Sequence, residues 1–396
     1  MSMYKKYVKP ILFRFSPDTA HNMTVRAGRV AQSIPPVRYA LRKMWSYDHP
    51  SLQQEILGVT LKNPVGLSAG FDKNVQLTPL IESVGFGFET AGSVTLPPRT
   101  GNPRPWFHRL PKTGSLVVYA GMANHGLISM TPELRRNQKK LHGMPLSISV
   151  AVAPQQNGFH TFEEAIVDAK NATTYIINND LAQMVEINIS CPNVGSVPFS
   201  EPELLEKLMT ELDKVDRTVP FFAKMPYLKD MEKFDELLEV LSRHNVQGVT
   251  IANLVKDREG VPLKDPLSDD IKGGLSGVPT REQSVELIRH TYRHFGDRFI
   301  IAGVGGIFSG EDAYEKIRAG ATVVELITGM MFEGPQVIGQ INRDLVKFLK
   351  RDGFSNISEA VGVDVDMTPR STASKASVGA SPAPTTKSHI VAAAAS

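Results

Sequence analysis

Short apolar runs rich in Val, Ile, Leu and Phe alternate along this chain with longer segments that have helical periodicity. Eight of the runs have the length of strands buried on both faces, at residues 63–67, 86–94, 146–152, 184–190, 221–225, 248–253, 299–304 and 323–328. Amphipathic helices are predicted between them, most clearly over 201–215 and 229–244. This alternation predicts an α/β fold in which eight parallel strands close into a (β/α)8 TIM barrel. An open, doubly wound sheet is the alternative.

The first 46 residues follow a different pattern, in which basic side chains are interspersed with aromatic and aliphatic ones. Nine basic residues and one acid, Asp18, give this segment a charge of +8, so the other 350 residues sum to −5 in a chain of net charge +3. The segment lacks the unbroken apolar stretch of a cleaved secretion signal. We predict a small helical extension of one or two amphipathic helices. The second covers residues 20–32, with Ser16 or Asp18 as its cap and Pro35 and Pro36 beyond its end.

The last residues, 367–396, are dominated by Ser, Thr, Ala and Pro and contain no aromatic or acidic residue. Such a segment cannot bury enough apolar surface to offset the entropy lost on ordering, so we predict a disordered tail. The expected organisation is therefore a basic helical segment over 1–46, a barrel over 47–366 and a tail over 367–396.

Composition excludes several classes of function. A single cysteine rules out an internal disulfide and any multi-cysteine metal site, and we predict no metal. The near-balanced charge argues against a nucleic-acid partner. No run of 18 apolar residues occurs, so no transmembrane span is expected.

Polar and reactive residues gather where the predicted strands end, which in a barrel is the C-terminal face. The fourth strand leads into Asn188, Cys191 and Asn193, and the sixth ends at Asn253. Amide groups suit a ligand that alternates C=O and N–H groups, and a thiol is a candidate nucleophile or general base. The alternative for Cys191 is a small buried apolar side chain with no chemical role.

Two lysines occupy further strand ends. Lys73 follows the first strand, where the alternative is a surface lysine in an ordinary turn. Lys224 ends the fifth strand, and a charge there is costly unless it faces a partner. We predict that Lys224 lies beneath an electron-accepting ring and stabilises the negative charge that appears on reduction, although a lysine reaching out to the barrel rim is the alternative.

A phosphate site is predicted from two glycine-rich loops, at 273–277 and 303–307, and from the segment 327–329. Barrels commonly bind phosphate at the loops after strands seven and eight. Neither loop matches a dinucleotide fingerprint or a phosphate loop with Gly-Lys-Ser/Thr. A phosphorylated, flat, redox-active cofactor fits this combination, and flavin mononucleotide (FMN) fits it best.

The ordered motifs resemble the dihydroorotate dehydrogenase family, in its membrane-associated, quinone-using class. The resemblance covers roughly residues 3–365. It is carried by FSPDTAH at 15–21, NPVGLSAGFDK at 63–73, GSVT at 92–95, GNPRP at 101–105, NISCPN at 188–193 and the two glycine loops.

The resemblance implies oxidation of (S)-dihydroorotate to orotate in pyrimidine synthesis, with bound FMN as electron carrier and a quinone as acceptor. Cys191 stands at the position of the base that removes the C5 proton, while the C6 hydride passes to flavin N5. The implied substrate contacts are Lys73, Asn188, Asn193 and Asn253. The implied FMN contacts are Ala69, Gly70, Ser93, Ser149, Asn188, Lys224, Ala252, Gly277, Gly306, Thr328 and Gly329. His21 and Arg109 match quinone-site positions.

Several residues depart from the family pattern. The quinone class normally has serine where this chain has Cys191, a residue typical of the soluble classes. Val118 stands where a substrate-binding asparagine is usual, and the loss of a buried amide costs about 1–3 kcal/mol if its partner stays unpaired. Ser149 replaces an asparagine and Ala252 a threonine. Ile327 stands where a quinone-side tyrosine is common.

These departures keep other hypotheses open. One is a flavin barrel of the same ancestry that acts on another dihydropyrimidine or uses another acceptor. Another is a degenerate flavoprotein without catalysis. With the quinone-dependent enzyme as the first hypothesis, the fourth is a barrel that reduces uridines in transfer RNA. Such an enzyme needs a basic groove to bind RNA, and the net charge of −5 outside the first 46 residues argues against one. The basic amphipathic segment predicts peripheral attachment to the inner face of the cell membrane, or to the mitochondrial inner membrane in a eukaryote.

Overall fold

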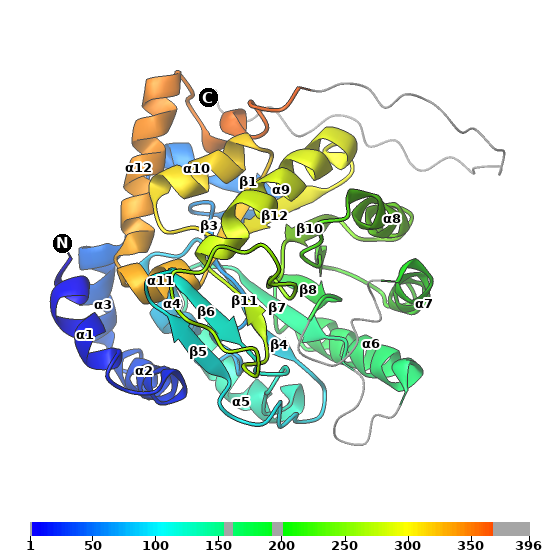
Figure 1. The fold of residues 1–396 in the computed structure, drawn as a ribbon, viewed down its shortest axis with the longest axis horizontal. Helices are drawn as coiled ribbons and strands as arrows, with labels where there is room; N and C mark the ends of the chain where they lie inside the picture. The colour runs from blue at the N-terminus through cyan, green and yellow to red at the C-terminus, as the bar shows by residue number, and fades with distance from the viewer. Residues whose placement is uncertain (1, 154–160, 192–200, 367–396) are drawn as a thin grey trace. The chain divides into compact units, whose positions relative to one another are not determined.

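Eight parallel strands close into a barrel, in the circular order β3, β4, β7, β8, β9, β10, β12 and β13 (Figure 1). The structure is a computed structural model that describes residues 2–153, 161–191 and 201–366. The barrel strands are β3 (Val65–Leu67), β4 (Phe88–Val94), β7 (Leu146–Ala151), β8 (Met184–Asn188), β9 (Phe221–Lys224), β10 (Gly248–Ile251), β12 (Ile300–Val304) and β13 (Val323–Leu326). All eight predicted strands and the TIM barrel are thus confirmed, and the doubly wound alternative is wrong. The predicted tail at 367–396 lies outside the described residues, and the predicted boundary at residue 46 stays a prediction.

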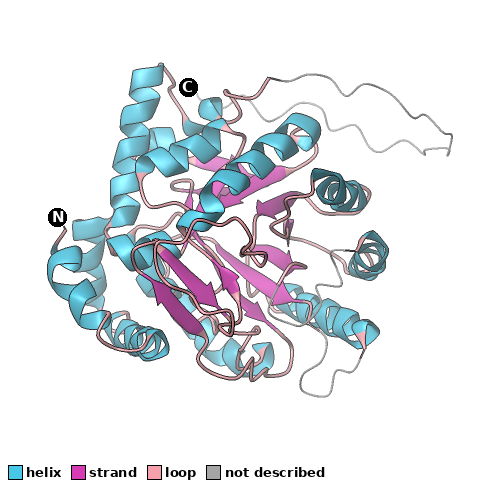
Figure 2. Ribbon diagram, viewed as in Figure 1, coloured by secondary structure: helices cyan, strands magenta, loops and turns pink. Residues whose placement is uncertain are grey.

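Helices surround the barrel (Figure 2). They are α4 (Thr78–Val84), α5 (Leu127–Gln138), α6 (Phe162–Asn178), α7 (Pro202–Leu212), α8 (Met231–Ser242), α9 (Arg281–Phe295), α10 (Gly310–Arg318), α11 (Thr328–Glu333) and α12 (Val337–Asp352). Short 3₁₀ turns are η2 (Pro50–Leu52), η4 (Val278–Thr280) and η5 (Ile357–Ala360). The helices predicted over 201–215 and 229–244 are α7 and α8. Helix α8 begins where the Asp230 side chain accepts the N–H groups of Glu232 and Lys233, an N-cap that the sequence favours.

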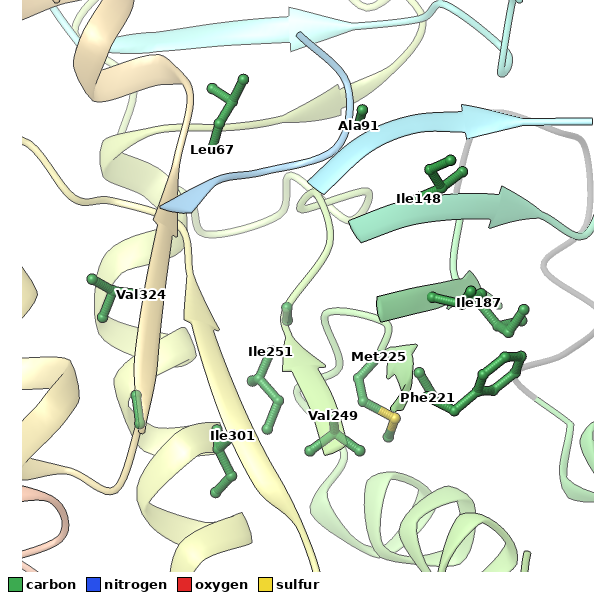
Figure 3. Close-up of a cluster of buried hydrophobic side chains, with 14 of the residues drawn as sticks. Leu67, Ala91, Ile148, Ile187, Phe221, Met225, Val249, Ile251, Ile301 and Val324 are labelled. Carbon is green, nitrogen blue, oxygen red and sulfur yellow. The ribbon is translucent and has the colours of Figure 1, made fainter. Parts of the chain in front are cut away.

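The outer surface of the barrel is mostly apolar. Because successive side chains of a strand point to opposite faces, every second residue points away from the barrel axis. One fully buried side chain from each strand belongs to this set: Leu67, Ala91, Ile148, Ile187, Phe221, Val249, Ile301 and Val324 (Figure 3). They pack with apolar residues of the surrounding helices in one core, which holds the helices on the barrel.

The inward-pointing side chains form three layers along the barrel axis. The first layer is apolar: Phe88, Met184, Phe222, Ile300 and Val323. A hairpin that the sequence analysis missed, β1 (Gln54–Ile56) with β2 (Val59–Leu61), packs against this layer at the N-terminal mouth. The second layer is polar: Thr90, Ser147, Glu186, Thr250 and Glu325. The third layer carries Lys224 and Asn188 at the C-terminal mouth.

A second small sheet, also missed, lies next to the C-terminal mouth. It pairs β5 (Phe107–Leu110), β6 (Ser115–Val118) and β11 (Gly274–Leu275) in the order β11-β6-β5. Gly273 precedes β11 at a φ of +120°, and a Cβ there would lie 2.4 Å from the carbonyl oxygen of Val118. The close pairing of these strands therefore requires glycine at this position.

The basic N-terminal segment is helical, with one helix more than predicted. It contains a π-helical turn η1 (Tyr4–Val8) and the helices α1 (Lys9–Leu12), α2 (Pro17–Ala31) and α3 (Pro35–Trp45). Helix α2 corresponds to the predicted 20–32 helix, and Ser16 is its cap because its Oγ accepts the Thr19 N–H at 3.2 Å. The prolines expected only to end this helix also begin α3, since proline suits the first turn of a helix.

Asp18 has a different role from the predicted cap and joins α2 to β5. Its carboxylate accepts the N–H of Trp106 at 3.1 Å and of Phe107 at 3.3 Å, and it pairs with the Arg104 guanidinium at 2.8 Å. Arg109 of β5 completes the junction by donating to the carbonyl oxygens of Leu12, Phe13 and Phe15. The N-terminal helices are therefore fixed beside the C-terminal mouth of the barrel.

We predict that Asp18→Ala destabilises this junction. The change leaves two backbone N–H groups and a guanidinium without their acceptor, so the free energy of unfolding should fall by about 1–3 kcal/mol. Thermal unfolding and the rate of tryptic cleavage within residues 1–46 measure the effect. Asp216→Ala, at an exposed aspartate, is the control and should change neither. Equal behaviour of the two variants would contradict this role of Asp18.

Candidate active site

A cavity with about 1240 Å³ of empty space, counting its open mouth, lies at the C-terminal end of the barrel. Fourteen of the predicted site residues line it: His21, Ala69, Gly70, Lys73, Ser93, Asn188, Cys191, Lys224, Ala252, Asn253, Gly277, Gly306, Thr328 and Gly329. They come from the ends of β3, β4, β8, β9, β10, β12 and β13, from the loop before η4 and from α2. The strand ends therefore converge on one cavity as the barrel prediction required.

Two predicted residues that the structure describes, Ser149 and Arg109, do not line this cavity. Ser149 is fully buried behind Ser93, to which its hydroxyl is hydrogen-bonded at 2.9 Å. Arg109 is engaged by the carbonyl groups of the N-terminal segment, as described above. Asn193 lies outside the described residues.

Lys224 is a buried cation at the floor of the cavity. Its side chain is 5% exposed, and Nζ donates to the Ser68 Oγ at 3.1 Å. The period of two along β9 directs this side chain into the barrel. The side chain is therefore buried inside the barrel and does not reach out to its rim. Its position beneath an electron-accepting ring stays a prediction.

Amides and hydroxyls form a connected network on one wall. Asn188 Nδ2 donates to the Ser93 Oγ at 2.9 Å, and Asn253 Nδ2 donates to the Ser190 Oγ at 3.0 Å and to the Asn188 Oδ1 at 3.3 Å. These bonds fix the orientation of both amides before any ligand arrives. A flat ligand that alternates C=O and N–H groups would therefore meet donors and acceptors at fixed positions.

Lys73 supplies the second cation of the cavity. Its Nζ is buried and has no hydrogen-bond partner among the described residues. It lies 4.6 Å from the ring centroid of Phe107 and 5.7 Å from that of Trp106. Burial lowers the pKa of Lys73 to about 8, against the opposing charge of Asp18. A buried ammonium without a partner is costly, so this position favours an anionic ligand.

His21 lies at the mouth of the cavity among aromatic rings. Burial, with the charges of Lys73 and Arg104, lowers the pKa of His21 to about 3, so the imidazole is neutral at physiological pH. Its ring lies 5.7 Å from that of Phe71 and 5.6 Å from that of Phe107. Such a surface suits an apolar, aromatic ligand better than a charged one.

Two consecutive glycines line the end of the cavity beside β12. Gly305 and Gly306 have φ values of +101° and +72°, which side chains rarely adopt. Among the described residues, their N–H groups have no hydrogen-bond acceptor. Two bare N–H groups in a turn of this kind are an anion-binding arrangement, and they lie next to Thr328 and Gly329 at the start of α11 in the same cavity lining.

Arg99, which the sequence analysis did not identify, is a buried guanidinium close to Cys191. Its Nε donates to the Gly121 carbonyl oxygen at 2.9 Å and its Nη1 to that of Ala153 at 3.3 Å. Cys191 packs against Ala153 and Met122, so the thiol and the guanidinium share neighbours. Burial lowers the pKa of Arg99, and the charges of Cys191 and Asp168 act in the opposite direction.

Asp168 on α6 is close enough to Arg99 for the two charges to influence each other. Burial raises the pKa of Asp168 to about 6, opposed by the Leu96 N–H and the charge of Arg99. The sequence carries no local signal for this group, because Arg99, Asp168 and Cys191 belong to three separate segments that only the fold brings together.

Comparisons with known proteins assign the chain to a family. A sequence profile described as "Dihydroorotate dehydrogenase" matches residues 51–349. The chain is 31% identical over 364 residues to "Dihydroorotate dehydrogenase (quinone)" of Roseiflexus castenholzii, covering 91% of this chain and 96% of that protein. It is 33% identical over 361 residues to the protein of the same name of Halobacterium salinarum, covering 90% and 99%. The fold resembles the crystal structure of DHODH from Eimeria tenella in complex with ferulenol, with a TM-score of 0.76, 25% identity and coverage of 88% and 96%.

We predict that Arg99 increases the reactivity of the Cys191 thiol by favouring the thiolate. In Arg99→Gln, alkylation of the protein by iodoacetamide near neutral pH should slow on the order of tenfold, because the buried positive charge is lost. The chain has one cysteine, so mass spectrometry reports this site alone. Arg135→Gln, on the surface of α5, should alkylate at the wild-type rate. An unchanged rate in Arg99→Gln would refute the electrostatic link.

Proposed function

This chain belongs to the dihydroorotate dehydrogenase family, and we propose on that basis that it oxidises (S)-dihydroorotate to orotate with bound FMN and passes the electrons to a quinone. The observation that carries the proposal is the cavity at the C-terminal end of the barrel, in which two cations, a thiol and oriented amides converge. The family match over 51–349 and the quinone-using relatives support the same activity.

FMN fits the residues of this cavity. The bare N–H groups of Gly305 and Gly306 suit its phosphate, with Gly277, Thr328 and Gly329 beside them. We assign Lys224 to the pyrimidine end of the ring system, and Ala69, Gly70, Ser93 and Ala252, which line the same cavity, to contacts with the ring. Bound FMN would supply the electron-accepting centre for oxidation of the substrate at C6 and for electron transfer to the acceptor.

The substrate would lie against the amide wall. Asn188 and Asn253 are held by the hydrogen bonds described above, and Asn193 is the third amide that we assign to the substrate. The unpartnered Lys73 ammonium suits the carboxylate of dihydroorotate, because pairing would offset the cost of its burial.

Cys191 is the proposed general base that removes the C5 proton. A thiolate performs this step without the separate activation that a serine hydroxyl needs. Arg99 would act through Cys191 as a positioning residue, because its charge favours the thiolate before proton transfer. As the thiolate takes up the proton, the local charge changes by one unit next to the Arg99–Asp168 pair.

The mouth between α2 and β5 is the proposed entrance for the quinone. His21, Phe71 and Phe107 give it an uncharged aromatic wall, and we assign Arg109 to the outer part of this entrance. Large apolar side chains of the N-terminal helices are exposed, including Met3, Ile11, Val30, Tyr39 and Met44. Together with the excess of basic residues, they support docking on an anionic membrane surface, on the inner face of the cell membrane or of the mitochondrial inner membrane.

No helix of the described ranges 2–153, 161–191 and 201–366 is long and apolar enough to cross a membrane.

Val118 favours a second candidate, in which the substrate is another dihydropyrimidine. Its side chain lines the cavity on β6, where it offers neither a donor nor an acceptor to a ligand. If Val118→Asn raises the turnover of dihydroorotate, the first candidate is supported. If this substitution brings no gain, and the unaltered protein oxidises a related dihydropyrimidine, the second candidate is supported.

The proposed base gives a prediction for Cys191→Ala. Flavin reduction by dihydroorotate should slow by about 10²–10⁴-fold, because proton removal loses its catalyst. The flavin content and the rate at which a quinone reoxidises the reduced protein should stay the same, since neither involves the thiol. Stopped-flow absorbance separates the two half-reactions. Reduction at the wild-type rate would exclude Cys191 as the base.

The proposed carboxylate contact gives a prediction for the pH dependence of orotate binding. The pKa of Lys73 is about 8 without ligand, so the cation is present below that pH. Binding of an anion raises this pKa, and the affinity should therefore be constant below about pH 8 and fall up to tenfold per unit above it. Titration of the flavin absorbance with orotate measures this.

Two variants control this measurement. Lys73→Gln should bind orotate more weakly and lose the decline above about pH 8. Lys139→Gln, at an exposed lysine, should keep the wild-type profile. The same decline in Lys73→Gln would assign it to another group.

A further inference from the structure

The polar second layer inside the barrel contains two carboxyl groups, Glu186 and Glu325. Both side chains are 1% exposed. They line a separate cavity with about 420 Å³ of empty space, counting any open part, whose other walls are the apolar first layer and the β1–β2 hairpin at the N-terminal end of the barrel. TIM-barrel interiors are usually filled with branched apolar side chains, and buried carboxyl groups there carry a large desolvation cost.

Neither carboxyl group is fully satisfied by the protein. Among the described residues, both oxygens of Glu186 and the Oε2 of Glu325 have no hydrogen-bond partner. The Oε1 of Glu325 accepts the Thr90 hydroxyl at 2.7 Å. Groups this costly and this poorly satisfied indicate a role other than stability.

The pair is electrostatically connected to the active site through Lys224. Burial and the charge of Glu186 raise the pKa of Glu325 to about 7, while the charge of Lys224, the hydrogen bond from Thr90 and the nearby Ser68 hydroxyl oppose this rise. Ser68 also accepts the hydrogen bond from Lys224, so it lies between the cation and the carboxyl group. The remaining polar groups of the lower cavity are the hydroxyls of Ser147 and Thr250.

We propose that Glu325, with Glu186 beside it, is a proton-exchange site that takes up a proton when the flavin above Lys224 is reduced and releases it on reoxidation. This inference rests on the proposed function, because it requires FMN at Lys224. The pair would keep the interior of the barrel close to constant charge during turnover.

The physical cause is the change in the field of Lys224. With oxidised flavin, the ammonium favours the ionised form of Glu325. When two electrons reduce the flavin, the negative charge gained there pairs with Lys224 and offsets its effect on the carboxyl group. One proton then passes from solvent to a carboxylate oxygen of Glu325. No electron reaches the residue, and the proton returns to solvent when the acceptor withdraws the electrons.

Infrared difference spectroscopy of the flavin-loaded protein tests this directly. Electrochemical reduction near pH 8 should produce a protonated-carboxyl band that shifts in D₂O and corresponds to a fraction of a proton per flavin. Glu325→Gln should lack the band. Glu186→Gln should keep it but show its maximum at lower pH, because the charge that raises the pKa of Glu325 is gone.

Asp168→Asn is the matched control. This substitution removes another buried carboxyl group with a raised pKa, which belongs to α6 and not to the barrel interior. The spectrum of the variant should therefore keep the protonated-carboxyl band. A wild-type spectrum without the band, or a band that persists in Glu325→Gln, overturns the proposal.

Failure of this inference can be distinguished from failure of the proposed function. Protein that binds no flavin, or whose flavin dihydroorotate does not reduce, contradicts the proposed function. Infrared spectra of the flavin-free wild-type protein and of flavin-free Glu325→Gln can also be compared at a series of pH values. Their difference should show a carboxyl group that titrates near neutral pH. Its absence overturns the proton site independently of flavin.

Discussion

The alternation of side chains along eight closed strands is the constraint on which the rest of this structure depends. Outward positions are mostly apolar, because they pack under helices, as Ile148 and Val324 do, and the buried Glu89 is an exception. Inward positions do not pack under helices, so from the second layer to the C-terminal mouth they can be polar. They carry Glu325, Lys224 and Asn188. Chemistry can therefore be placed inside the barrel without weakening the contact between strands and helices.

Charge is arranged in depth along the barrel. The carboxyl pair lies lowest, Lys224 forms the floor of the active-site cavity, and Lys73 lies among the aromatic rings towards the mouth. Each cation is buried where a proposed ligand brings negative charge, the reduced flavin above Lys224 and the substrate carboxylate at Lys73. The neutral His21 lies near the mouth, against the rings of Phe71 and Phe107.

The sequence allowed the barrel and most of the cavity lining to be predicted, because apolar runs mark strands and the polar residues at their ends must meet at one face. Lys224 and Asn188 were found in this way. Arg99 was not, since its proximity to Cys191 depends on how a loop folds back over the barrel. Glu186 and Glu325 were not recognised because each interrupts an otherwise apolar strand, and the small sheet β5-β6-β11 has strands too short to give a periodic signal. Ser149 occupies a position expected to contact the cofactor, yet its hydroxyl is directed to Ser93.

The central claim is that the barrel cavity couples dihydroorotate oxidation to quinone reduction through one flavin. Anaerobic mixing of the purified, flavin-loaded protein with dihydroorotate, followed by a soluble quinone, fumarate or NAD in separate samples, tests it most directly. We expect dihydroorotate to bleach the flavin absorbance and the quinone alone to restore it quickly. A flavin that stays oxidised with dihydroorotate, or that recovers with NAD or fumarate and not with the quinone, would contradict it.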